Sequence, residues 1–273
     1  MRNYSGIISL NKNSRGVYTL DTSIGCHSGL KNNPKGCYND CYAAKSSKLY
    51  GYDFSKTVLR YFESEYHRRQ IVHEINNIKL DFVRIGNSGD PSENWEHTIS
   101  ILDKIKFINK QIVIITKHWT NLNLNQLGFL KGINVCINTS ISALDEPELL
   151  SNSLNQYHIL KNYCKSVLRI VSCDFNLENE TGHKLHKIQV DLFKNENVLD
   201  TVLRVNKNNQ LVKDGIINVK QSKFLGKKTM ISKYNKKTYF GKCSTCLEMC
   251  GVNMGVENIK LPISKQLNIF KNV

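Results

Sequence analysis

The feature that most limits the fold of this 273-residue chain is a regular alternation of short apolar runs with helix-like segments. The apolar runs are rich in β-branched residues, which is typical of strands buried on both faces of a parallel sheet. Strands and helices that alternate at intervals of about 25 to 35 residues predict parallel βαβ units, and therefore an α/β fold. The predicted strands span residues 81–85, 111–116, 134–140, 167–171 and 198–205, and the predicted helices span 91–105, 122–130 and 146–161.

Two architectures share this alternation, a partial or full (βα) barrel and a doubly wound sheet. Upstream of it, residues 7–10 and 17–20 are short β-type runs, and the apolar spacing over 55–77 predicts a long helix. The strand pattern weakens after Lys207.

In both architectures, ligands bind where the parallel strands end. Asp90 directly precedes Pro91, so it is also a candidate helix cap. Lys117 and His118 also fit ordinary solvated residues. The residues at the predicted strand ends, most of them polar, are Gly86, Asn87, Ser88, Gly89, Asp90, Lys117, His118, Ser140, Ser142, Ser172 and Asp174.

The first residues lack the apolar stretch of a signal peptide, and no window approaches the ~20 apolar residues that span a bilayer. We therefore expect a cytoplasmic protein with no membrane contact. Because cytosolic thiols are kept reduced, the nine cysteines favour metal binding or packing over disulfides. Cys136, Cys164 and Cys173 are scattered among apolar residues, which predicts a packing role.

The first cysteine group, Cys26, Cys37 and Cys41, lies in the stretch 25–42, whose glycines and proline we expect to prevent regular structure. Three thiolates leave one coordination position of a metal centre open for a substrate or cofactor. The alternative is a structural zinc site, with His27 as the fourth ligand.

The second cysteine group is Cys243, Cys246 and Cys250, in a Cys-x-x-Cys-x-x-x-Cys arrangement. This spacing is a strong metal signal. It predicts either an auxiliary iron–sulfur cluster or a zinc site completed from elsewhere, for example by Cys173 or a histidine. A reduced pair with a third buried cysteine nearby is the alternative without metal.

The formal charge is +15, and residues 206–242 contain ten lysines and a single acid, Asp214. A basic segment of this kind favours contact with nucleic acid or another polyanion, although a biased coding composition has the same appearance.

Four motifs together resemble radical S-adenosylmethionine enzymes, and more closely the phage-type radical-SAM-like proteins. They are the Gly-Cys and Gly-Cys-x-x-x-Cys-Tyr-Ala segments of the first cysteine group, the Gly-Asn-Ser-Gly-Asp strand end, the Ile-Thr-Lys strand end and the Thr-Ser-Ile-Ser strand end. The likeness covers most of residues 17–175. The usual spacing in that superfamily is Cys-x3-Cys-x2-Cys, whereas this chain has Cys26-x10-Cys37-x3-Cys41.

The resemblance implies a βα barrel core over residues 1–205, followed by a small, basic, Cys-rich region over 206–273. It implies a 4Fe–4S cluster held by Cys26, Cys37 and Cys41, while the spacing of Cys243, Cys246 and Cys250 separately predicts a second iron–sulfur cluster or zinc. It further implies that the cluster reduces S-adenosylmethionine to a 5′-deoxyadenosyl radical, which abstracts hydrogen from a substrate. The implied S-adenosylmethionine contacts are Tyr42, Gly86, Asn87, Ser88, Gly89, Asp90, Ser140 and Arg169.

The resemblance also implies a flavodoxin- or ferredoxin-like electron donor. The basic segment 206–242 suggests a nucleic acid or nucleotide substrate. The alternative hypothesis is a non-catalytic zinc-binding protein that binds DNA or RNA through residues 206–242.

Overall fold

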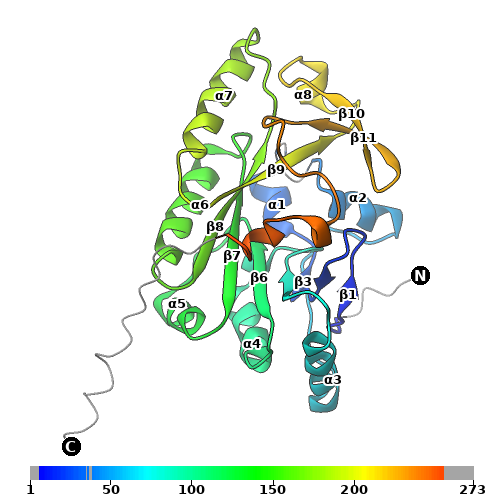
Figure 1. Ribbon diagram of the computed structural model, residues 1–273, viewed down its shortest axis with the longest axis vertical. Helices are drawn as coiled ribbons and strands as arrows, with labels where there is room; N and C mark the ends of the chain where they lie inside the picture. The colour runs from blue at the N-terminus through cyan, green and yellow to red at the C-terminus, as the bar shows by residue number, and fades with distance from the viewer. Residues whose placement is uncertain (1–5, 35, 37–38, 255–273) are drawn as a thin grey trace, which may run out of the picture.

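The computed structural model describes residues 6–34, 36 and 39–254, which form a mixed α/β fold around one large sheet (Figure 1). In the large sheet, the neighbouring strands β2, β5, β6, β7, β8 and β9 pair in parallel, whereas β1, β11 and β10 pair with their neighbours in antiparallel fashion. The predicted α/β fold is therefore confirmed at the level of a large, mostly parallel sheet. In spatial order the strands are β1 (Asn11–Lys12), β2 (Tyr18–Thr19), β5 (Phe82–Ile85), β6 (Gln111–Thr116), β7 (Val135–Ile141), β8 (Lys165–Ser172), β9 (Val198–Val205), β11 (Lys227–Ser232) and β10 (Lys220–Phe224).

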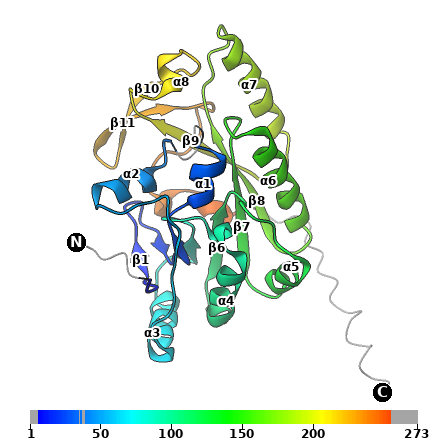
Figure 2. The same cartoon turned by 180° about the vertical axis from the view of Figure 1, so that it is seen from behind.

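The long helices pack against one face of this sheet. Alternate strand residues such as Ile85, Ile114 and Ile137 meet apolar helix residues such as Ile75 and Ile101 in a single buried cluster. Seen from behind in Figure 2, α4 and α6 lie in front of the strands. The helices are α3 (Glu65–Asn76), α4 (Trp95–Ile105), α5 (Leu124–Lys131), α6 (Pro147–Leu160) and α7 (Glu180–Leu192), with a short α8 (Gln210–Lys213) after β9.

The opposite face of the sheet is covered by the last described residues. Cys243 and Cys250 pack against strand residues that include Phe82, Val113 and Val167. These cysteines lie on two short 3-10 turns, η2 (Cys243–Thr245) and η3 (Met249–Gly251). In Figure 1 this segment, coloured orange, crosses in front of the central strands. Residues remote in sequence from the strands thus return to the helix-free face.

The predicted helix over 55–77 is wrong in its first half. Residues Val58–Leu59 form β4, which pairs with β3 (Ser23–Ile24). The helix α3 begins only at Glu65, because Ser64 caps it by accepting a hydrogen bond from the His67 amide at 3.1 Å. The predicted strand at 7–10 is also absent from the described structure. Ile7 makes one isolated bridge to Tyr61, and the strand in this region is β1.

The first cysteine group also departs from the expectation of irregular structure. A short helix, α1 (His27–Asn32), follows Cys26, and α2 (Tyr42–Leu49) follows Cys41. Gly29 is accommodated within α1 as a buried residue. The glycines therefore shape this segment without preventing helices.

Within the described residues, no helix is long and apolar enough to cross a membrane.

Candidate functional site

A cavity of about 1670 Å³ brings the two cysteine groups together with the strand ends. Its walls include every described residue of the two cysteine groups and every predicted S-adenosylmethionine contact, but not His27 or Cys173, the predicted additional zinc ligands. Cys37 lies outside the described residues. The named residues in the walls are Cys26, Cys41, Tyr42, Gly86, Asn87, Ser88, Gly89, Asp90, Ser140, Arg169, Cys243, Cys246 and Cys250.

The first cysteine segment is fastened to the end of β5. Gly25 forms a parallel bridge with Gly89, and its amide donates to the Ser88 carbonyl oxygen at 3.0 Å. A side chain at Gly25 would meet the Lys56 carbonyl oxygen at 2.0 Å, and its φ of +93° suits glycine. Close backbone contact at this glycine therefore sets the entry of Cys26 into the cavity.

Cys41 stands at the amino terminus of α2. Burial raises the pKa of its thiol, while the amides of Ala44 and Ala43 and the charges of Lys45 and Arg204 act in the opposite direction. A helix amino terminus and nearby cations are the surroundings that stabilise a thiolate. Cys41 is thus placed so that a metal could draw it into the ionised form.

Tyr42 connects the same helix to the glycine-rich strand end. Its hydroxyl donates to the side-chain oxygen of Asn87 at 3.0 Å and also to the Asn87 carbonyl oxygen. The ring lies beneath the guanidinium of Arg204, which is 5.3 Å from the ring centroid. Tyr42 therefore links three separate elements of the cavity wall.

Asp21 organises the strand end itself, and the sequence analysis did not identify it. Its carboxylate accepts hydrogen bonds from the amides of Gly86, Asn87 and Ser88 at 3.1, 2.7 and 3.0 Å. Burial raises the pKa of Asp21, against the lowering effect of the Asn87 amide and of the Arg60 and Arg84 charges. The available signal was an acid directly after a predicted strand.

Asp90 is a cap, as its position before Pro91 predicted. Its buried carboxylate accepts from the Ser92 amide at 2.9 Å, from the Thr116 hydroxyl at 2.6 Å and from the Lys117 amide at 2.8 Å. Burial raises its pKa despite these hydrogen bonds. Asp90 lines the cavity, but its main contacts hold the ends of β5 and β6 together.

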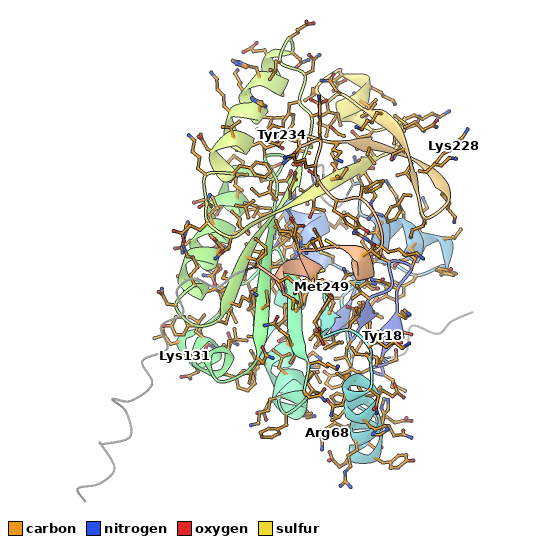
Figure 3. The ribbon with its side chains drawn as sticks, in the orientation of Figure 1. Tyr18, Arg68, Lys131, Lys228, Tyr234 and Met249 are labelled. Atoms are coloured by element: carbon orange, nitrogen blue, oxygen red, sulfur yellow. The ribbon has the colours of Figure 1, made fainter. Side chains whose placement is uncertain are left out.

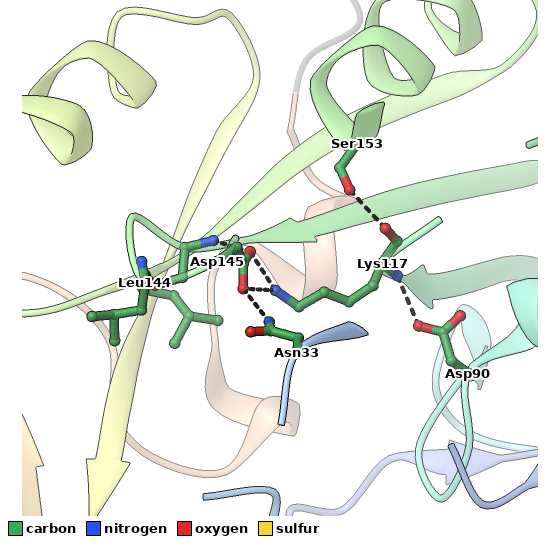
Figure 4. A network of polar contacts seen from close by, with 8 residues as sticks. Asn33, Asp90, Lys117, Leu144, Asp145 and Ser153 are labelled. Atoms are coloured by element: carbon green, nitrogen blue, oxygen red, sulfur yellow. Dashed lines mark hydrogen bonds and ion pairs between the residues drawn. The ribbon is translucent and has the colours of Figure 1, made fainter. Parts of the chain in front are cut away.

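Lys117 and His118 are not solvated residues, which corrects that reading of the sequence. Lys117 is 8% exposed and forms an ion pair with Asp145, whose carboxylate also accepts from the Asn33 amide group at 2.9 Å (Figure 4). His118 is fully buried, and its Nε2 lies 3.0 Å from the Thr139 hydroxyl. Burial lowers the pKa of His118 to about 3, so it is neutral.

Ser140 and Arg169 are neighbours in the register of β7 and β8. Arg169 donates two hydrogen bonds to the Asn138 side-chain oxygen, at 2.8 and 3.1 Å, and one to the Thr201 hydroxyl at 3.1 Å. Three of the five N–H donors of the guanidinium are thereby engaged, and its plane is fixed.

In the second cysteine group, Cys243 and Cys250 are buried and Cys246 is half-buried. A hydrogen bond from the Cys243 thiol lowers the pKa of Cys250. Burial acts in the opposite direction and raises this pKa, while the charges of Arg169 and Arg84 lower it further. The same hydrogen bond, followed by burial, raises the pKa of Cys243. Within this hydrogen-bonded pair, the thiolate form is therefore favoured more at Cys250 than at Cys243.

The donor set suits metal–sulfur chemistry, although the described side chains are not preassembled for it. No three described His, Cys, Asp or Glu side chains are grouped as a metal site. Thiols nevertheless reach the cavity from both groups, near arginines that would offset thiolate charge. His27 is exposed and Cys173 packs in a different apolar cluster, and neither lines the cavity.

The three remaining cysteines behave as predicted. Cys136, Cys164 and Cys173 are at most 5% exposed, and each is packed among apolar side chains.

Comparisons with protein-family models, with curated proteins and with solved structures gave no match to this chain.

Proposed function

We propose that this chain is a radical S-adenosylmethionine enzyme with its active site in the cavity described above. One observation carries the proposal: the described cysteines of both groups, Cys26 and Cys41 from the first and all three of the second, line the same cavity as a glycine-rich strand end. A thiol-rich cavity at the carboxyl ends of parallel strands is a suitable place for a redox cofactor.

The arrangement of layers supports a barrel-like core in preference to a doubly wound sheet. A doubly wound sheet carries helices on both faces, whereas a barrel carries them outside and leaves the inner face to side chains and ligands. Here the long helices pack on one face, and the other face carries the cavity and residues 243–254. We therefore propose a partial (βα) barrel.

Within this proposal, Cys26, Cys37 and Cys41 would hold a 4Fe–4S cluster, and Cys243, Cys246 and Cys250 would hold a second iron–sulfur cluster or zinc. With an electron from a flavodoxin- or ferredoxin-like donor, the first cluster and S-adenosylmethionine would supply a 5′-deoxyadenosyl radical for hydrogen abstraction.

The residues of the chain would bind and orient this cofactor. Arg169, with its plane fixed by Asn138 and Thr201, presents a guanidinium suited to the carboxylate of methionine, and Ser140 presents a hydroxyl suited to the ribose. The Asp21 carboxylate accepts hydrogen bonds from the amides of Gly86, Asn87 and Ser88, and these bonds fix the backbone conformation of the strand end. A pre-formed wall of this kind lowers the entropic cost of binding.

Release of 5′-deoxyadenosine tests the proposal. Anaerobically reconstituted protein, incubated with S-adenosylmethionine and a chemical reductant, should release it. Cys41→Ala should abolish the release, because a thiolate ligand is lost. Cys164→Ala is the matched control, since Cys164 is buried in a helix-face cluster away from the cavity, and it should retain the release. Equal release by the Cys41→Ala protein would refute the assignment.

A further inference from the structure

Five arginines line the cavity without a carboxylate partner among the described ion pairs. These are Arg15, Arg60, Arg84, Arg169 and Arg204. Arg84 is 7% exposed, and its Nε has no hydrogen-bond partner in the described structure. The acids Asp21, Asp90 and Asp145 line the cavity and are engaged by amides, hydroxyls or Lys117. The other acids in the described cavity walls are Asp40, Glu146, Asp200 and Glu248. Eight described lysine and arginine side chains and seven described acids line the cavity, so its formal charge is nearly balanced, but its five arginines have no ion-pair partner among the described residues.

The arginines also lie close enough together to repel one another. Burial is the main cause that lowers the pKa of Arg169; the charges of Cys250 and Cys243 oppose this effect, and the charges of Arg84 and Arg15 add to it. Burial likewise lowers the pKa of Arg204, with a contribution from Arg15. Buried like charges are costly unless an anion lies between them. A bound anion would relieve the repulsion that Arg15 exerts on Arg169 and Arg204.

Aromatic rings flank two of these arginines. The guanidinium of Arg204 lies 5.3 Å from the Tyr42 ring centroid and 5.4 Å from that of Phe224, and Arg15 lies 5.6 Å from Phe224. Phe224 stacks on Phe240 at 4.6 Å with an angle of 26° between the rings. All of these residues line the cavity. Arginines beside stacked rings can bind phosphate and a nucleobase together.

The β10–β11 hairpin extends the positive charge beyond the cavity. Lys227 is the cross-strand partner of Phe224, so the two side chains share a face. On the other face Lys223 stands directly opposite Lys228, which Figure 3 shows at the outer end of the hairpin. All three lysines are exposed, and none is in a described ion pair. Like charges directly opposite one another destabilise a hairpin, and a bound polyanion removes that cost.

We propose that the cavity receives one nucleotide of a single-stranded nucleic acid. The backbone phosphates follow the hairpin lysines to Arg15 and Arg204, and the base stacks at Phe224 and Phe240. A single strand is favoured over a duplex because stacking on a ring requires an unpaired, exposed base face. The cavity volume of about 1670 Å³ exceeds the roughly 300–1,000 Å³ of ordinary ligand pockets, leaving room for a cofactor and a nucleotide.

The inference rests on the proposed function only in treating this cavity as the active site. Binding of the strand needs neither the cluster nor S-adenosylmethionine, so it can be measured independently.

Fluorescence anisotropy of a labelled oligothymidylate of about 12 nucleotides tests the proposal on the full chain without S-adenosylmethionine. Arg204→Gln should weaken binding about tenfold and reduce the slope of log K against log salt by about 0.7, the value for one phosphate contact on a single strand. Phe224→Leu should also weaken binding about tenfold while leaving that slope unchanged, because stacking releases no counterions. Lys223→Gln with Lys228→Gln should reduce the slope further.

The matched control is Lys104→Gln with Lys131→Gln, which removes two exposed lysines from α4 and α5 and should leave affinity unchanged. The hairpin double variant should unfold at the same temperature as the unmodified chain or a higher one, since a repulsion is removed. A low affinity in that variant is then not a folding defect.

Equal affinity of all three hairpin and cavity variants with the unmodified chain would overturn the proposal. Competition by thymidine monophosphate as strong as that of the oligonucleotide would overturn it in favour of a mononucleotide ligand, and tighter binding of a duplex would overturn it in favour of duplex recognition. Oligonucleotide binding without 5′-deoxyadenosine release would refute the radical function and support the nucleic-acid inference. Release of 5′-deoxyadenosine without oligonucleotide binding would support the radical function and refute the nucleic-acid inference.

Discussion

The Lys117 ammonium lies 2.6 Å from the Asp145 carboxylate in the interior of the protein. The pair joins the end of β6 to the end of β7, and Asn33, at the end of α1, donates to the same carboxylate. Removal of one partner leaves the other charge buried and uncompensated. The pair therefore couples the first cysteine segment to the sheet.

Lys117→Met should lower the free energy of unfolding by about 3 kcal/mol, the size expected when a buried ion pair loses one member. Lys117→Met combined with Asp145→Asn should lose less, because no net charge then remains at the site. Urea unfolding measures both. Lys106→Met, which breaks the surface pair with Asp103, is the control and should change stability by at most about 0.5 kcal/mol. A loss in the double variant as large as that of Lys117→Met, or larger, would contradict the coupling.

Gly86→Ala should destabilise the strand end. Gly86 has a φ of +89°, and an added Cβ would lie 2.2 Å from the Ile115 carbonyl oxygen, so the backbone must move. We expect a loss of about 2 kcal/mol or more in thermal or urea unfolding. Gly128→Ala is the matched control: this glycine lies within α5 and has open space around its Cβ position, so alanine should stabilise the helix by about 0.5–1 kcal/mol. Equal effects of the two substitutions would show that close packing at Gly86 is unimportant.

His118 should make the fold sensitive to mild acid. Its folded-state pKa of about 3 is lower than the ordinary value, so between that value and about 6.5 the unfolded chain binds the proton more readily. The contribution of His118 to the free energy of unfolding is then fully present above about pH 6.5. It falls as the pH decreases below that value, by up to about 1.4 kcal/mol per pH unit. His118→Asn should reduce this slope, and asparagine tolerates the φ of +56° at this position.

The measurement is urea unfolding at several pH values between neutrality and about pH 5, where the unperturbed imidazole titrates. His183→Asn, at an exposed position on α7, is the control and should retain the slope of the unmodified chain. An unchanged slope in the His118→Asn protein would contradict the buried neutral state.

The central sheet could be predicted because its strands are short apolar runs between periodic helices, as in Gln111–Thr116 before α5. The rule that parallel strands end at one edge then placed Ser140 and Gly86 near each other without knowledge of tertiary contacts. Both residues line the same cavity. Local pattern and a topological rule were sufficient for these features.

Contacts between distant residues could not be predicted in the same way. The partners of Asp21 are more than 60 residues away, and Lys117 pairs with a residue 28 positions later, so no local pattern marks them. The hairpin β10–β11 was missed because its strands are polar and lysine-rich, and they are stabilised by pairing with β9. Burial of Cys243 and Cys250 likewise depends on the whole sheet.

The proposed function depends most directly on which metal the cysteines hold. Iron, acid-labile sulfide and zinc analysis of anaerobically purified and reconstituted protein, together with its absorption spectrum, decides this. We expect a brown protein that contains iron and sulfide and bleaches on reduction, with iron lost in the Cys41→Ala protein and retained in the Cys164→Ala protein. A colourless protein with stoichiometric zinc and no iron would contradict the proposal.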